Sequence, residues 1–127
     1  MRDILMVFGR VLMSAIFIQA GLSELIHLGG TVGYFKSLGL PLPWVTVWIV
    51  LAVELVGGVA ILVGHRTRLA ATILGFFSFA AGLIGHLDIG DSIQMQMLMK
   101  DIAISGGLFY LVAHGAGLLS LDARREV

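Results

Sequence analysis

The sequence predicts an all-α integral membrane protein, an antiparallel four-helix bundle with a short interfacial helix between the first two long helices. Hydrophobic residues make up 58% of the 127 residues and charged residues only 13%, whereas roughly 25% of a typical soluble domain is charged. The mean hydropathy is +1.01. A small soluble domain needs far more polar surface than this chain can supply.

Four apolar stretches approach the length of about 20 residues that a membrane-spanning helix needs. They cover residues 4–22, 44–63, 69–87 and 102–121. Backbone groups find no water in lipid, so these stretches should be helices. We expect helices at about 4–28, 43–64, 68–87 and 97–120. The connections are too short to fold alone, so residues 1–127 should form a single transmembrane domain.

The longest connection carries interfacial residues. Tyr34 and Phe35 stand next to Lys36, and aromatic rings beside a lysine suit the depth of lipid headgroups. We expect a short helix on the outer surface here. Gly39 should end it, and Pro43 then suits the first turn of the next helix.

Basic residues predict the orientation in the membrane. Six of them fall on one side of a four-span bundle, namely Arg2, Arg10, Arg66, Arg68, Arg124 and Arg125. Only Lys36 and Lys100 fall on the other side. Because short cytoplasmic loops carry an excess of Lys and Arg, we expect both termini in the cytoplasm.

Composition also excludes several classes of function. Eight Lys and Arg balance eight Asp and Glu, so there is no overall positive field for nucleic acid. There is no cysteine, which excludes disulfides and cysteine-ligated metal centres. The sequence has no phosphate-binding loop and no paired nucleophile and base. We therefore expect no independent catalysis and no intrinsic cofactor.

Two charged residues lie within the apolar stretches, where a charge costs at least about 2.5–3.5 kcal/mol. Glu54 is at the centre of its stretch, and Arg10 lies below the centre of the first. Counting rise along each helix separates them in depth by roughly 6 Å, which an arginine can reach. Glu54 is therefore a neutral acid, a proton carrier or half of an ion pair with Arg10. Such a pair could be purely structural, or its carboxyl could serve a proton or a quinone ring.

A second polar group is expected near the outer surface. By helical rise, Glu24, His86 and Lys100 lie at similar depth, and Gln19 lies one to two turns deeper than Glu24. Together they could line the mouth of a ligand pocket with Glu54 as its floor. The alternative is that these side chains simply reach the headgroups.

The metal-binding hypotheses are weak. Met95, Met97 and Met99 alternate along the last connection, and thioethers suit copper(I), but methionine is also common as flexible packing. A single Glu-x-x-His from Glu24 to His27 falls short of a di-iron site, which needs two such motifs and two further carboxylates. We expect no metal.

Taken in order, these residues resemble the DoxX family of small bacterial four-helix membrane proteins. The resemblance covers nearly the whole chain. It rests on Gly9-Arg10, Gly21-Leu22-Ser23, residues 38–43 (LGLPLP), Glu54 with Gly57-Gly58, residues 64–68 (GHRTR), His86, Lys100, Gly106-Gly107 and residues 119–122 (LSLD). At Glu24 and Asp101, members of the family often carry Lys and Asn instead.

The resemblance implies an accessory role in a membrane-bound, quinone-linked oxidoreductase complex, with quinone as the associated redox molecule. Its partners would be the lipid bilayer and other membrane oxidoreductase proteins. Two alternatives stay open. The chain could bind or carry a small molecule or lipid in a cavity around Glu54. It could also be a structural scaffold, since 17 glycines leave helix faces suited to close packing, within one chain or in a homo-oligomer.

Overall fold

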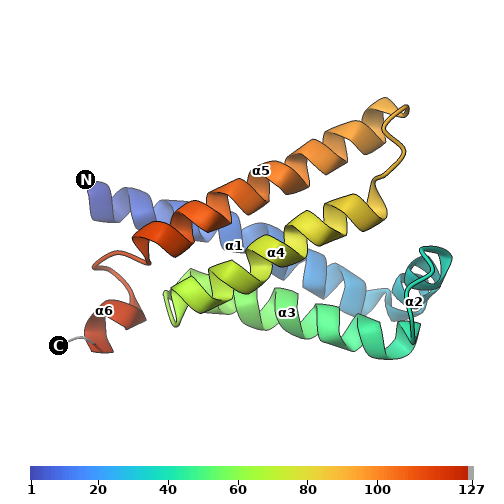
Figure 1. Cartoon of the computed structure of the whole chain (residues 1–127). Helices are drawn as coiled ribbons and strands as arrows, with labels where there is room; N and C mark the ends of the chain where they lie inside the picture. Colours follow the sequence, from blue (N-terminus) through green and yellow to red (C-terminus); the bar gives the residue numbers. More distant parts are fainter. Residues whose placement is uncertain (126–127) are drawn as a thin grey trace.

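The computed structural model describes residues 1–125, which fold into helices joined by short loops (Figure 1). The helices are α1 (Arg2–Ile26), α2 (Leu28–Ser37), α3 (Pro43–Val63), α4 (Thr67–Gly85), α5 (Ser92–His114) and α6 (Leu121–Arg125). No strand occurs among the described residues. The predicted all-α fold class is confirmed.

The four long helices form two closely packed pairs, α1 with α3 and α4 with α5, and α3 joins the pairs through α4. Successive long helices run in opposite directions, and the two ends of the chain lie at the same end of the bundle (Figure 1). By contrast, α1 and α5 touch only briefly, near Met13 and Gly107. The bundle is therefore open between α1 and α5.

Small residues set the close approach of the helices. A Cβ atom added to Gly58 of α3 would lie 3.0 Å from the Ile18 side chain of α1, and one added to Gly75 of α4 would lie 2.9 Å from the Phe109 ring of α5. Around these contacts, Ile61 and Leu74 are fully buried. The glycines thus serve packing within the chain.

Three helices are long and apolar enough to cross a membrane, α1, α3 and α4. Their outward faces carry large apolar side chains that water would disfavour, including Phe8, Val56 and Phe76, each more than 60% exposed. Such faces suit contact with lipid. Helix α5 is 23 residues long but more polar, because its first half holds Gln94, Gln96, Lys100 and Asp101.

The fourth long helix differs from the expected range of 97–120. It begins at Ser92 because the Asp91 side chain accepts hydrogen bonds from the N–H groups of Ile93 and Gln94, the usual role of an aspartate at a helix N-cap. It ends at His114 because Gly115 adopts a positive φ of 75°, a conformation that only glycine enters readily. Residues 115–120 form a loop that leads into the short helix α6. We call residues 115–125 the C-terminal segment.

The expected short helix between the first two long helices is α2, and Gly39 follows its end with a φ of 74°. Its Val32 and Phe35 pack on Val47 and Leu51 of α3. A Cβ atom on Gly85, at the end of α4, would lie 3.2 Å from the Tyr34 hydroxyl. Helix α2 therefore covers the ends of α3 and α4 that lie away from the two ends of the chain.

Candidate functional site

Arg10 is the most deeply buried basic residue of the bundle, at 3% exposure. Its Nη1 donates to the main-chain carbonyls of Ile61 and Leu62, at 3.3 and 3.0 Å, and its Nη2 donates to that of Leu119. The first two carbonyls belong to the last turn of α3. There the N–H of the C-cap Gly64 also donates to the Ile61 carbonyl at 3.2 Å, and the Leu62 carbonyl is one of those that a helix end leaves without a partner. The guanidinium therefore satisfies the negative end of α3 and ties it to the C-terminal segment.

The expected ion pair between Arg10 and Glu54 does not form. Helices α1 and α3 are offset along their length, so that Glu54 lies level with Gly21 of α1, where a Cβ atom would be 3.5 Å from the Glu54 Cβ. Eleven residues separate Arg10 from Gly21, or roughly 16 Å along the helix. The expected separation in depth of roughly 6 Å was wrong because the two helix centres are not level.

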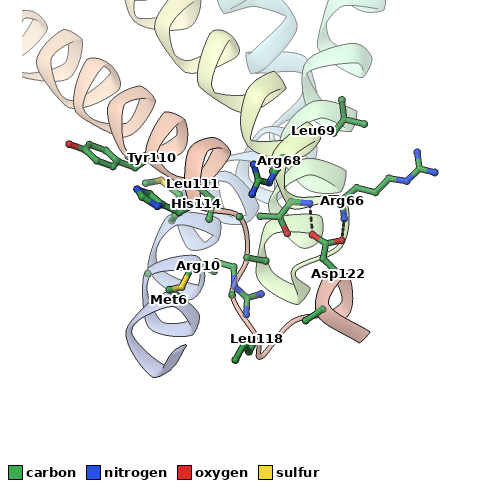
Figure 2. Close-up of a pocket in the computed structure, with 18 of the residues that line it drawn as sticks. Met6, Arg10, Arg66, Arg68, Leu69, Tyr110, Leu111, His114, Leu118 and Asp122 are labelled. Atoms are coloured by element: carbon green, nitrogen blue, oxygen red, sulfur yellow. Dashed lines mark hydrogen bonds between the residues drawn. The ribbon is translucent and has the colours of Figure 1, made fainter. Parts of the chain in front are cut away.

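Asp122 fastens the C-terminal segment to the start of α4. Its Oδ1 accepts from the main-chain N–H of Arg66 at 2.6 Å and its Oδ2 from that of Thr67 at 2.9 Å, as Figure 2 shows, while its own N–H donates to the Gly64 carbonyl at 2.8 Å. Burial raises the pKa of the Asp122 carboxyl, but these hydrogen bonds and the nearby His65 ring outweigh it, so the pKa lies below its usual value. Both oxygens are occupied at the N-terminus of α4.

Arg10 and Asp122 border a cavity of about 1010 Å³ at this end of the bundle (Figure 2). It lies between α1, the start of α4, the end of α5 and the C-terminal segment. Its lining includes Met6, Arg10, Met13, Arg68, Leu111, His114 and Leu118. Five of the chain's eight Lys and Arg residues line it, with Asp122 as the single carboxylate among the lining residues of the described chain. We call it the basic-end cavity.

Glu54 and Glu24 form a carboxyl pair between α1 and α3, in which Glu54 is buried and Glu24 is half-buried. Gly21 allows the two helices to touch, since an added Cβ atom would lie 2.7 Å from the Leu55 side chain. Glu24 lies about one turn further along the same face of α1 than Gly21, which places its side chain beside Glu54. Glu54 is 6% exposed. Each residue has one carboxyl oxygen that is buried without a hydrogen-bond partner.

A family model matches the part of the chain that contains most of these residues. The DoxX family model matches residues 5–87, which include Arg10, the carboxyl pair and the loop that Asp122 binds. The chain belongs to the DoxX family.

Curated relatives extend the similarity to nearly the whole chain. The inner membrane proteins YqjF and YphA of Escherichia coli (strain K12) are each 32% identical to it, over 96% and 97% of this chain and 92% and 91% of their own lengths. A protein named "Putative oxidoreductase CatD" of Bacillus subtilis (strain 168) is 37% identical over 61% of this chain and 53% of its own length. No solved structure is significantly similar. The relatives and the three candidate spans identify a multi-pass protein of the inner membrane.

In this DoxX-family chain the side chains of Glu24, His86 and Lys100 do not form the expected polar ring. Glu24 lies with Glu54, while His86 lies between α4 and α5. There its Nε2 is 3.8 Å from the Asp101 carboxylate and its Nδ1 is 2.7 Å from the Gln94 side-chain oxygen. The His86–Asp101 contact is the only ion pair in residues 1–125. The polar residues of the outer end therefore form two separate clusters.

The other predicted site residues point outward. Gln19 is exposed on the outer face of α1, in a shallow groove that neither Glu24 nor Glu54 lines. Lys100 is exposed as well. Met95 and Met99 share one face of α5 and Met97 lies on the opposite face, because successive helical residues turn by about 100°. The three thioethers therefore do not converge, and no group of three or more His, Asp or Glu in residues 1–125 could hold a metal ion.

The basic-end cavity is the feature that sequence reasoning missed. Its signal was present in the six arginines assigned to one side of the membrane, which served only to predict orientation. The net charge of zero gave no indication of this cluster, because acidic residues elsewhere in the chain balance it.

Proposed function

We propose that this chain is an accessory membrane subunit of a quinone-linked oxidoreductase, in which the Glu24–Glu54 carboxyl pair holds a proton for quinone chemistry. The observation that carries the proposal is a buried carboxyl, that of Glu54, beside the half-buried Glu24, with no basic residue in ion-pair contact with either in residues 1–125. Two neighbouring carboxylates repel each other when both are ionised, and a proton on one of them relieves that repulsion. A pair of this kind takes up or releases a proton without a large rearrangement.

The chemistry of quinones gives such a pair a use. Reduction of a quinone to a quinol takes two electrons and two protons. Under this proposal a partner protein with a redox cofactor supplies the two electrons. The carboxyl pair supplies one proton to a quinone oxygen and regains it from solvent, and solvent supplies the second proton to the other quinone oxygen. Membership of the DoxX family and the similarity to a protein named as an oxidoreductase support the redox setting. The hypothesis of a small-molecule or lipid carrier gains less support, since Glu54 lines neither of the cavities described above. The hypothesis of a structural scaffold gives the carboxyl pair no use.

The test is the rate of quinone reduction in membranes from a strain lacking this chain, complemented with wild-type or variant protein. We expect Glu54→Gln and Glu24→Gln to lower the rate by roughly 10²-fold, within the range attributed to positioned acids and bases. Asp88→Asn is the matched control, because Asp88 is an exposed carboxyl at the same end of the bundle. The tagged wild-type chain should also bring down a flavin or haem protein in mild detergent.

Two results would contradict the proposal. One is quinone reduction at the wild-type rate in membranes that lack the chain. The other is equal activity of Glu54→Gln and Asp88→Asn at matched expression.

A further inference from the structure

The basic-end cavity contains a buried cation with an unused hydrogen-bond donor. The Nη1 and Nη2 atoms of Arg10 are occupied by main-chain carbonyls, but its Nε is buried without a partner. No carboxylate of residues 1–125 lies within ion-pair distance of this guanidinium. The nearest acid that lines the cavity, Asp122, already accepts from two main-chain N–H groups. The positive charge of Arg10 is therefore incompletely balanced by the chain.

A second cation enters the same cavity from the opposite wall. Arg68 lines it from α4, and its guanidinium lies beside Gly115, where a Cβ atom would be 3.4 Å from its Nε and Nη2. His114 lines the cavity from the end of α5 (Figure 2). The Arg66 side chain, by contrast, extends away (Figure 2). Arg10, Arg68 and His114 thus surround one space from three elements.

Apolar side chains also line the cavity. They include Met6 and Met13 of α1, Leu111 of α5 and Leu118 of the C-terminal segment. The space extends between α1 and α5, since Gly9 and Met13 of one helix and Gly107 and Tyr110 of the other line it. An occupant would therefore meet both basic groups and apolar side chains.

We propose that the basic-end cavity binds the phosphodiester headgroup of an anionic phospholipid from the adjacent leaflet, with an acyl chain in the opening between α1 and α5. Arginine matches the geometry of phosphate oxygens and is weakly hydrated, so it favours phosphate in a partly buried site. The apolar walls accept the beginning of the acyl chain, which a soluble phosphate ester lacks. This inference uses none of the residues of the carboxyl pair and stands independently of the redox proposal.

Native mass spectrometry of the full-length chain in mild detergent tests the inference. The protein is offered equal amounts of phosphatidylglycerol and phosphatidylcholine with identical acyl chains. We expect phosphatidylglycerol to be retained selectively and Arg68→Gln to weaken its binding about tenfold, as for one lost hydrogen bond to a charged group. Arg68 is exposed, so the variant should fold, which far-ultraviolet circular dichroism checks. Arg124→Gln is the matched control, because Arg124 is an exposed arginine outside the cavity lining.

The source of the phosphate is tested by competition. Glycerol 3-phosphate carries the charge without acyl chains and should displace the lipid poorly. Displacement at an affinity equal to that of the lipid would overturn the inference in favour of a soluble phosphate ester. Equal retention of the two lipids, or equal loss in Arg68→Gln and Arg124→Gln, would overturn it altogether.

Discussion

At the basic end of the bundle the buried charge of Arg10 meets main-chain carbonyls, whereas further along α1 the buried carboxyl of Glu54 lies beside a second carboxyl, that of Glu24. The exposed fractions of Arg10 and Glu54 are similar, at 3% and 6%. Their partners differ in kind. A helix end offers a fixed negative dipole to Arg10, so that residue gains stability from its place. Glu54 gains no opposite charge from its neighbour.

This difference separates residues that stabilise the fold from residues that are available for chemistry. Arg10, Gly64 and Asp122 join the C-terminal segment to α1, α3 and α4. The carboxyl pair joins only α1 and α3, which already pack closely through Gly21 and Gly58. Substitutions at the basic end should therefore lower the free energy of unfolding, while those at the carboxyl pair should leave it nearly unchanged.

The largest expected effect is that of Arg10→Gln. The carbonyls of Leu62 and Leu119 would lose the Arg10 donor, while that of Ile61 would keep only the Gly64 N–H, and each buried unsatisfied group costs about 1–3 kcal/mol. We expect the free energy of unfolding to fall by about 3 kcal/mol, measured by titration with sodium dodecyl sulfate and followed by circular dichroism. Arg2→Gln is the control, because Arg2 is exposed. A loss below about 1 kcal/mol would contradict the anchoring role of Arg10.

Gly64→Ala should have the next largest effect. Gly64 has a φ of 73°, and an added Cβ atom would lie 2.4 Å from the Ser120 Cβ and 2.7 Å from Nη1 of Arg10. Backbone strain and crowding together should lower the free energy of unfolding by about 2 kcal/mol. Gly106→Ala is the matched control, since an added Cβ atom there meets nothing within 4 Å. That variant should gain up to about 1 kcal/mol from helix propensity, and the same titration compares the two.

Asp122→Asn should cost about 1 kcal/mol, the usual loss when a side chain that caps a helix N-terminus is weakened. The wild-type protein should also show a pH dependence. Because the pKa of Asp122 in the folded state is below its ordinary value of 3.8, its contribution is fully present above that value and is lost as the pH falls through the lowered pKa. Wild type and Asp122→Asn should therefore differ in free energy of unfolding at neutral pH. This difference should shrink as the pH is lowered from 3.8 through the lowered pKa. A constant difference between them would show that the carboxylate charge is not what stabilises the segment.

Much of this fold follows from the sequence, since apolar stretches, Gly39 and Pro43 mark the long helices and the short one between them. The end of α5 was harder to predict from the sequence. Residues 115–120 are as apolar as a helix, and only the positive φ of Gly115 and Gly117 turns the chain back toward Arg10. A glycine in an apolar stretch does not by itself predict which backbone conformation it adopts.

The candidate site was predictable in its residues and less so in its pairings. Glu54, Glu24 and Arg10 stand out as charges within apolar stretches, because burial makes such residues costly. Which of them meet depends on the offset between α1 and α3. That offset follows from the contacts of Gly21 with Leu55 and of Gly58 with Ile18, which are side-chain details of packing. Counting residues along each helix separately gives no measure of the offset between the two helices.

The smallest expected effect is the energetic coupling between Arg10 and Glu54, and it is the sharpest test of the offset. If the two residues formed an ion pair, each single substitution to glutamine would strand a buried charge at a cost of about 3–5 kcal/mol, and the double substitution would recover much of it. In the structure they are separated by roughly 16 Å along α1, so the effects of Arg10→Gln and Glu54→Gln should add within about 0.5 kcal/mol. Glu54→Gln alone should change the free energy of unfolding by less than about 1 kcal/mol, because the amide can still hydrogen-bond to Glu24. Four titrations under identical detergent conditions complete the cycle, with Glu24→Gln combined with Glu54→Gln as the positive control for coupling between neighbours. Recovery of stability in the double variant of Arg10 and Glu54 would place these two residues in contact and would remove the distinction between a structural end and a chemical end of the bundle.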